Sequence, residues 1–376
     1  MNRTILIRYG ELALKGNNRE YFEKKLVDNI KKAMKTIGNI HIIVARERGR
    51  IILKISYDQA YDERQNQIKE QIIKLLSMIS GISSFSFAYE CDYNIEDNDV
   101  GEDNVGENNA GEDNVGENNA GEDNVEEDNT DENDMEDNAD DNTDNEKLFK
   151  NLTNCFDENL LSIIKEKISD AEKSKKQLRF RATATRLVKT GINSHELQQK
   201  LGSHVWTATE GKLKVDLKNF DFQIEAEILK KAYIFSSYDH YIGKAGLPLG
   251  TQGTALALFF SDKIECCARA ATELMRRGTI PILITSPITS QDSKKSEFKK
   301  ALENIKANAP GFDIKTIPTE KNILEFANEF AETRDIRAIS VPDTIENIKT
   351  YETSLLILRP LIIDREMTKI EMLNTS

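Results

Sequence analysis

Residues 243–278 place the strongest constraint on the fold, because they carry the pattern of a β-strand that passes directly into an α-helix. A turn rich in glycine and proline precedes an apolar strand from Ala255 to Phe260, and a short polar loop leads into an amphipathic helix that ends at Gly278. The first N–H groups of such a helix are unpaired and point outward. In α/β proteins this arrangement is a common binding place for phosphate groups.

The loop of this chain, residues 261–267, contains no glycine. Phosphate-binding loops use glycine so that the backbone can approach the phosphate oxygens and adopt positive φ. Here Ser261, Asp262 and Lys263 begin the loop and Glu265 follows. An acidic side chain at this place opposes a bound phosphate by about 1 kcal/mol even at solvent-like screening. The sequence therefore predicts that the strand, loop and helix are kept while the phosphate chemistry is lost.

The loop ends in two adjacent cysteines, Cys266 and Cys267, which cannot easily form an ordinary disulfide with each other. With Cys91 and Cys155 they show no metal-type spacing. One hypothesis makes the adjacent pair sulfur carriers, and the other makes them buried structural thiols, since free cysteine is among the most buried residue types. The absence of a signal peptide and of a membrane-length apolar run predicts a reduced, cytoplasmic protein with no membrane partner.

The charge of the chain is divided unevenly along its length. A chain of 376 residues predicts two or three domains, and the net charge of −13 argues against a nucleic-acid partner. However, residues 92–146 hold 24 of the 64 acidic residues and no Lys or Arg, which leaves 51 basic against 40 acidic residues elsewhere. The remainder thus carries a balance of +11, as expected for a protein that binds RNA.

The acidic segment contains an almost perfect repeat, GEDNVGENNA. An irregular stretch rich in acidic residues and asparagine follows it. It offers too little apolar surface to offset the entropy of ordering, so it is predicted to be disordered. One hypothesis is that it competes with RNA for the basic remainder as an internal phosphate mimic. The alternative is repeat expansion in a tolerant connection between domains.

The N-terminal part predicts a ferredoxin-like βαββαβ arrangement. Its expected strands are residues 4–10, 40–45, 50–55 and 84–89, and its expected helices are residues 17–34 and 65–77. After the acidic segment we expect helices over residues 148–167 and 194–207 and strands over 178–182, 213–217, 222–228 and 231–236. Beyond Gly278, alternating strands and helices predict a doubly wound parallel sheet.

Three stretches carry a resemblance to a known family. ILIRYGELALKGNNREYFEKKLVDNI near the N-terminus, LRFRATATR with KLKVDLKNFDFQIEAEIL in the middle, and GLPLGTQG with the helix ending MRRG resemble the tRNA 4-thiouridine sulfurtransferases. The resemblance implies four regions: a ferredoxin-like domain (1–91), the acidic insert (92–146), a THUMP domain (147–240) and a truncated pyrophosphatase-loop α/β domain (241–376). Segment 357–362, ILRPLI, is similar to the family's LRPLIG.

The resemblance implies that the ferredoxin-like and THUMP domains bind the acceptor end of tRNA, including its single-stranded 3′ terminus. Cations suit phosphate positioning, which supplies affinity more than sequence specificity. The alternative for each is a solvated basic surface. The candidate RNA-binding residues are Arg8, Lys15, Arg19, Arg179, Arg181, Arg186, Lys189, Lys214 and Lys218.

Three other side chains of the middle region have less specific interpretations. His195 and His204 lie about two and a half turns apart in one expected helix, and no third donor is spaced to make them metal ligands. Trp206 is interpreted as a core residue, with stacking on a base as the alternative.

An active family member uses ATP to adenylate a uridine and then replaces its oxygen with sulfur. Aligned with the family's loop, Asp262 and Lys263 occupy the places of two glycines, so we predict a tRNA-binding protein with an inactive nucleotide domain and no cofactor. In the alternative, ATP and Mg²⁺ are used: Lys263 contacts phosphate, Glu265 binds the metal, and Cys266 or Cys267 accepts sulfur. A further alternative is a non-catalytic subunit, in a homodimer or in a heterodimer with an active paralogue.

Overall fold

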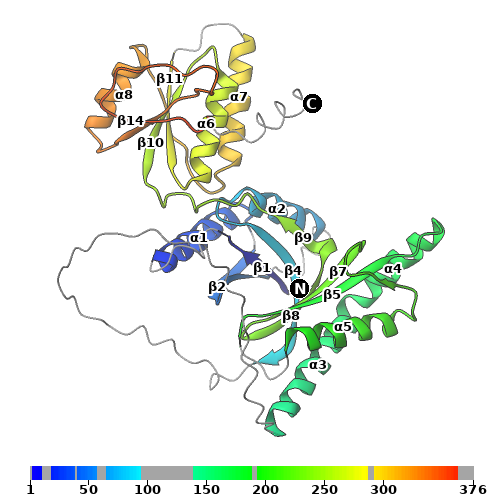
Figure 1. Cartoon of the computed structure of the whole chain (residues 1–376). Helices are drawn as coiled ribbons and strands as arrows, with labels where there is room; N and C mark the ends of the chain where they lie inside the picture. The colour runs from blue at the N-terminus through cyan, green and yellow to red at the C-terminus, as the bar shows by residue number, and fades with distance from the viewer. Residues whose placement is uncertain are drawn as a thin grey trace, which may run out of the picture.

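A computed structural model describes residues 2–10, 18–38, 40–56, 65–94, 139–188, 193–286 and 292–362. These residues form a nine-stranded sheet with its helices and a separate five-stranded sheet, seen in the lower and upper parts of Figure 1. Lys15, Lys189 and most of the acidic insert lie outside the described residues.

The ferredoxin-like arrangement predicted for the N-terminal part is confirmed. Its strands lie in the order β2-β3-β1-β4, and α1 and α2 bury apolar residues such as Leu26, Ile30 and Ile72 against Ile5 and Ile7 of the sheet. The elements are β1 (Asn2–Arg8), α1 (Arg19–Met34), β2 (His41–Glu47), β3 (Arg50–Ser56), α2 (Gln65–Met78) and β4 (Ser84–Asn94).

The second half of the large sheet continues from the first without a break. Strand β4 pairs with β1 through Ser84 to Ala88 and then with β8 at Tyr89 and Glu90, so one strand belongs to both halves. The sheet then runs β8-β7-β5-β6, with α3 and α5 packed on it. The elements are α3 (Ala139–Asn159), α4 (Leu161–Lys173), β5 (Arg179–Arg186), α5 (Ser194–Ala208), β6 (Lys214–Val215), β7 (Phe222–Ile228) and β8 (Lys231–Ser236).

Strand β9 (His240–Ile242) was not expected from the sequence. It returns to the first half of the sheet and pairs with β4 at Ser84 to Ser86. Residues on both sides of the boundary expected at residue 240 therefore contribute to one continuous sheet.

Two expected elements of the middle region are wrong in extent. The single helix expected over residues 148–167 is two helices that meet at Leu160, whose side chain is buried in the core. Asn159 bonds the carbonyl of Cys155 through its side-chain amide at 2.9 Å, the kind of local bond that competes with a continuing helix. The strand expected over residues 213–217 contains only the two residues of β6, at the edge of the sheet.

The C-terminal region is a doubly wound parallel sheet, as predicted. Its strand order is β12-β11-β10-β13-β14, with α6 and α7 on one face and α8 on the other (Figure 1). The order reverses between β10 and β13, which is where open α/β sheets bind ligands. The elements are β10 (Thr254–Phe259), α6 (Ile264–Arg276), β11 (Ile280–Thr285), α7 (Asp292–Ala307), β12 (Thr316–Pro318), α8 (Ile323–Glu332), β13 (Ala338–Ser340) and β14 (Leu356–Leu358).

Segment 243–253 joins the two sheets and contacts both. Asn29 of α1 donates a side-chain hydrogen bond to the carbonyl of Leu249 at 3.0 Å, and Leu247 forms an isolated parallel bridge with Arg277. Lys244 donates to the side chain of Asn308, just beyond α7. Across the described part of the chain, none of the helices has the length and apolar character to span a membrane.

Candidate functional site

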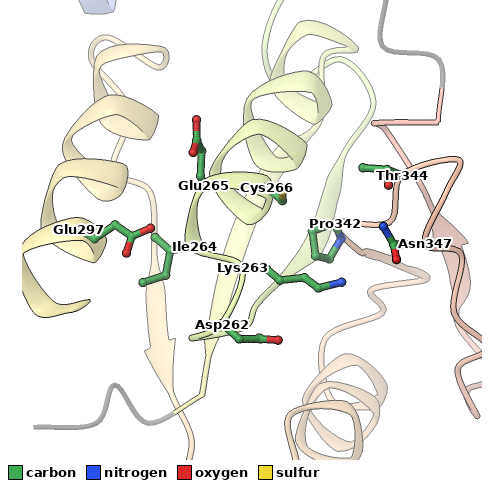
Figure 2. A pocket seen from close by; sticks show the side chains of 9 residues that line it. All are labelled: Asp262, Lys263, Ile264, Glu265, Cys266, Glu297, Pro342, Thr344 and Asn347. Carbon is green, nitrogen blue, oxygen red and sulfur yellow. The ribbon is translucent and has the colours of Figure 1, made fainter. Parts of the chain in front are cut away.

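A pocket of about 330 Å³ lies where the strand order of the parallel sheet reverses. It is lined by the loop after β10, the first turn of α6, the loop after β13 and one side chain of α7 (Figure 2). This is the place where the sequence predicts a degenerate nucleotide loop. The lining residues are Asp262, Lys263, Ile264, Glu265, Cys266, Glu297, Pro342, Thr344 and Asn347.

The loop after β10 is a tight turn with side chains on every residue. The backbone N–H of Lys263 bonds the carbonyl of Phe260 at 3.1 Å, and Lys263 is the N-cap of α6 without a capping side-chain bond. Figure 2 shows Lys263 and Asp262 pointing toward the loop that carries Asn347. The lining holds three carboxylates, those of Asp262, Glu265 and Glu297, against the single ammonium of Lys263.

The loop after β13 is held together by one buried carboxylate. Asp343 is 1% exposed and accepts hydrogen bonds from the backbone N–H of Lys349 at 3.1 Å, the hydroxyl of Tyr351 at 2.7 Å and Nε of Arg359 at 3.1 Å. Burial and the bond to Asp343 raise the pKa of Tyr351. Protein groups therefore use the anionic oxygens of Asp343, which are turned inward rather than toward a metal.

The two adjacent cysteines have different surroundings. Cys267 is buried, and its sulfur accepts the backbone N–H of Phe260 at 3.3 Å. Burial raises the pKa of its thiol to about 12, so it holds little of the thiolate that sulfur transfer requires. Cys266 lies in the first turn of α6, is partly exposed and lines the pocket.

This lining is a poor chemical match for a polyphosphate with its metal. No side chain caps the first turn of α6, but three carboxylates are among the side chains that line the pocket and no glycine opens the loop. Among the described residues, no group of three or more His, Cys, Asp or Glu side chains is arranged to hold a metal ion.

Arg8, a predicted RNA contact, forms its bonds with other residues of this protein. Its guanidinium bonds Glu227 of β7 and donates to the hydroxyl of Ser86 at 3.0 Å, and it lies 5.0 Å from the centre of the Phe235 ring. The side chains of Arg8 and Glu227 are 14% and 4% exposed. Arg50 of β3 completes the ion pair at 2.7 Å from the second oxygen of Glu227.

Arg19 is partly exposed and belongs to a small cluster at the start of α1. Its Nε lies 2.7 Å from Glu23, and the hydroxyl of Tyr9 donates to the same carboxylate. Burial and Glu23 raise the pKa of Tyr9 to about 12, so the tyrosine stays protonated as a donor. Arg19 is therefore fixed by Glu23 while part of its guanidinium remains exposed to solvent.

The other predicted cations gather near the edge strand β6. Arg179 pairs with Asp221 at 3.2 Å, whereas Arg181 bonds the neutral side chain of Gln223 and lies 4.0 Å from the centre of the Phe220 ring. Arg179 and Lys176 hold the pKa of Asp221 well below its usual range.

Lys214 and Lys218 are exposed, and neither takes part in an ion pair within the described ranges. Arg186 donates to Ser194 at 3.2 Å, at the start of α5. The structure thus brings Arg179, Arg181 and Lys214 together and places Arg8 and Arg19 in the other half of the sheet.

Sequence reasoning missed the Asp343 network and the partner of Arg8. Asp343 follows the end of a parallel strand, a position that could have been flagged, whereas nothing local to Arg8 indicates Glu227. His195 bonds Gln199 at 2.8 Å and His204 bonds Asp157 at 2.9 Å, so each histidine of α5 has a protein partner.

Comparison with known proteins agrees with this architecture. Residues 4–86 match the ThiI ferredoxin-like domain, and residues 156–237 match the THUMP domain. A probable tRNA sulfurtransferase of Acetivibrio thermocellus is 25% identical over 258 residues, which cover 69% of this chain and 47% of that protein. One of Bacillus subtilis is 24% identical over 406 residues, covering 99% and 80%. The chain spans about half the length of several such curated relatives.

Two solved structures share the fold. A Pyrococcus horikoshii protein has a TM-score of 0.66 at 20% identity, covering 99% of both chains. A 4-thiouridine synthetase, crystallised in complex with RNA and with bound ATP, has a TM-score of 0.59 at 19% identity, covering 100% of this chain and 85% of that one.

These features define a THUMP-domain protein with a ferredoxin-like domain before the THUMP domain and a doubly wound α/β domain after it. The chain is similar in sequence to curated proteins named probable tRNA sulfurtransferase, and it shares its fold with a 4-thiouridine synthetase.

Proposed function

We propose that this protein binds tRNA through its continuous ferredoxin-like and THUMP sheet, and that its C-terminal domain does not catalyse ATP-dependent thiolation. We place this function in the cytoplasm, where tRNA is available. The observation that carries the proposal is the contrast between the two candidate sites. Lys214 and Lys218 are exposed and without an ion pair among the described residues, and they lie with Arg181 near the edge of the THUMP sheet, whereas three carboxylates and one lysine line the pocket after β10.

The RNA part of the proposal is supported by the charges that remain after internal pairing. Arg181 bonds neutral groups, and Lys214 and Lys218 are exposed, so these three cations are available to phosphates. Arg19 adds a partly exposed cation in the ferredoxin-like half. Arg8 is omitted from the proposed surface because Glu227 already uses its charge.

The inactivity of the nucleotide domain is supported by three features of the pocket. Asp262 and Lys263 occupy the turn in which a phosphate would need backbone N–H groups that no side chain screens. Glu265 and Glu297 add negative charge to the wall, and Asp343 is already bonded by Arg359. Since adenylation depends on preorganised electrostatic stabilisation of the phosphates, a wall of this charge opposes the transition state.

The RNA proposal is tested by filter binding of tRNA at two or more salt concentrations. We expect the logarithm of affinity to fall steeply with the logarithm of salt, and the Lys214→Ala, Lys218→Ala double variant to reduce the slope by about 2. Lys321→Ala is the control, because Lys321 is also exposed but lies in the C-terminal domain, where it pairs with Glu329. Affinity that does not depend on salt, or no retention of tRNA, contradicts the proposal.

The nucleotide proposal is tested by titration with ATP and Mg²⁺ and by measuring AMP release in the presence of tRNA. We expect neither binding nor AMP release under conditions where the ATP-bound 4-thiouridine synthetase shows both. Release of AMP would instead favour an active sulfurtransferase with an atypical loop, in which Lys263 contacts phosphate. Cys266 is the sulfur acceptor to test in that case, since it lines the pocket while Cys267 is buried.

A protein that binds tRNA without modifying it can still serve a catalytic partner. We therefore also propose that this chain pairs with itself or with an active paralogue and presents the bound tRNA to the active site of that paralogue. Copurification from cells that express both proteins, followed by measurement of thiouridine in the bound tRNA, tests this role.

A further inference from the structure

Two cysteines of the THUMP half meet where a helix packs on a strand. Cys91 lies on β4 and Cys155 lies on α3, and both belong to one hydrophobic core. Their exposed fractions are 3% and 6%. Both are free thiols in the structure. They lie apart from the nucleotide pocket and from the cations of the proposed RNA surface, so neither of those sites accounts for them.

The two thiols are in direct contact. The thiol of Cys91 donates a hydrogen bond to the sulfur of Cys155, and it also lies 3.9 Å from the carbonyl oxygen of Tyr89. The side-chain amide of Asn159 donates to the sulfur of Cys155 at 3.8 Å. The surroundings therefore give the two sulfurs different roles, with Cys91 as a donor and Cys155 as an acceptor.

This arrangement favours the thiolate form of Cys155. The hydrogen bond from Cys91 lowers the pKa of Cys155 against the opposing effect of burial, and Asn159 adds to the lowering. The same bond and burial raise the pKa of Cys91. A thiolate is the form of cysteine that oxidants attack, and a second thiol beside it converts the first oxidation product into a disulfide.

Cys267 is equally buried but has different neighbours. Its sulfur accepts the backbone N–H of Phe260 at 3.3 Å and lies 3.9 Å from the carbonyl oxygen of the same residue. These bonds tie Cys267 to its own loop, as expected for a structural thiol. The bonds of Cys91 and Cys155 instead include each other, which burial alone does not require.

The position of the pair along the chain gives a bond between them a large effect. Cys91 precedes the acidic segment 92–146 and Cys155 follows it, so a disulfide would close a loop that contains the whole segment. It would also fix α3 to β4, the strand that belongs to both halves of the large sheet.

We propose that Cys91 and Cys155 are a redox modification site, at which a hydroperoxide converts the two thiols into a reversible disulfide that fixes α3 to β4. The proposal does not depend on RNA binding. In a reducing compartment such a disulfide is transient and senses oxidants, so the free thiols of the structure are its resting state.

The reaction with hydrogen peroxide takes two steps. The thiolate of Cys155 attacks one peroxide oxygen and breaks the O–O bond, which gives a sulfenic acid and a hydroxide that takes up the proton Cys155 had lost. The sulfur of Cys91 then attacks the sulfenic sulfur, and its proton leaves with the displaced hydroxide as water. The two thiols lose two electrons and the peroxide becomes two waters. Two equivalents of a small thiol restore the pair by exchange and become a disulfide themselves.

The test maps disulfides in the full-length protein after treatment with hydrogen peroxide and alkylation of the remaining thiols. Residues 75–146 contain no Lys or Arg, so trypsin leaves Cys91 in peptide 75–147 and Cys155 in peptide 151–165. We expect mass spectrometry to find these two peptides joined after oxidation and separate after reduction with dithiothreitol.

Thermal unfolding gives an independent readout. Closing a loop of this length restrains the unfolded chain, so we expect oxidation to raise the unfolding midpoint by about 5 °C or more, and reduction to reverse the rise. Cys155→Ala should abolish the rise. Cys266→Ala, which removes a partly exposed cysteine of the C-terminal domain, should keep it.

The peptide map decides the question even where Cys155→Ala fails to fold. Peptides 75–147 and 151–165 that remain separate after peroxide treatment overturn the proposal. Irreversible oxidation of Cys155 to its sulfinic acid overturns it too, because a second thiol in contact should intercept the sulfenic acid. A disulfide from either cysteine to Cys266 or Cys267 in place of the expected one has the same meaning.

Discussion

At the scale of single residues, charge by itself does not identify an RNA contact. Arg8 and Arg181 were predicted together from the sequence, but they have different roles. Arg8 is bonded to a carboxylate that is 4% exposed, whereas Arg181 bonds an amide and a ring. The difference is the partner across the sheet, which is Glu227 in one case and Gln223 in the other.

We therefore expect Arg8→Ala to lower the free energy of unfolding by about 2–3 kcal/mol, because Glu227 would remain buried with only Arg50 as its partner. Lys24→Ala is the control. Lys24 forms an exposed ion pair with Glu20, and its loss should cost less than about 0.5 kcal/mol. Urea unfolding measures both. Unchanged stability with weakened RNA binding would assign Arg8 to the RNA surface instead.

At the scale of elements, α6 is held to the rest of the chain through its C-terminal end. Leu247 donates its backbone N–H to the carbonyl of Arg276 at 2.8 Å, and Gly246 adopts φ of +80° beside the same carbonyl. A Cβ at Gly246 would lie 2.2 Å from that oxygen. In the glycine-rich turn before β10, glycine is thus required at position 246 by a close backbone approach.

Gly246→Ala should destabilise the protein by well over 1 kcal/mol, since it combines an unfavourable backbone conformation with a collision that neither backbone can avoid. Gly253→Ala separates the two contributions. Gly253 has a similar φ of +73°, but a Cβ there would meet no atom within 4 Å. Thermal or urea unfolding should show the larger loss for Gly246→Ala, and equal losses would exclude the collision as the cause.

At the scale of the whole molecule, Lys244 lies in the segment that joins the two sheets and bonds Asn308 just beyond α7. Burial lowers the pKa of Lys244 to about 8, with Glu273 opposing this shift and Arg276 adding to it. In the unfolded chain the lysine has its ordinary pKa, so between about pH 8 and pH 10.5 the unfolded state binds more protons than the folded state. Stability from this group therefore rises with pH across that range.

The comparison to make is between the wild type and Lys244→Met, both unfolded in urea at pH 7, 8, 9 and 10. We expect the wild type to gain stability relative to Lys244→Met as the pH rises, because titrations of other groups cancel in the difference. A constant difference across the range would show that Lys244 keeps an ordinary pKa in the folded protein.

The sequence by itself determined the order of nearly all the helices and strands, the separation of acidic from basic regions, and the absence of glycine from residues 261–267. These properties depend on neighbouring residues, so they can be predicted without a fold. It did not predict the break at Leu160 or the shortness of β6, because both depend on packing against other elements.

Only the tertiary structure decided which cations are free, that β4 serves both halves of one sheet, and that Trp206 is 50% exposed instead of buried in the core. Arg8 and Glu227 are 219 residues apart in the sequence. Cys91 and Cys155 come into contact only when α3 packs on β4. Contacts of this range are set by how the elements pack, and no local pattern in the chain records them.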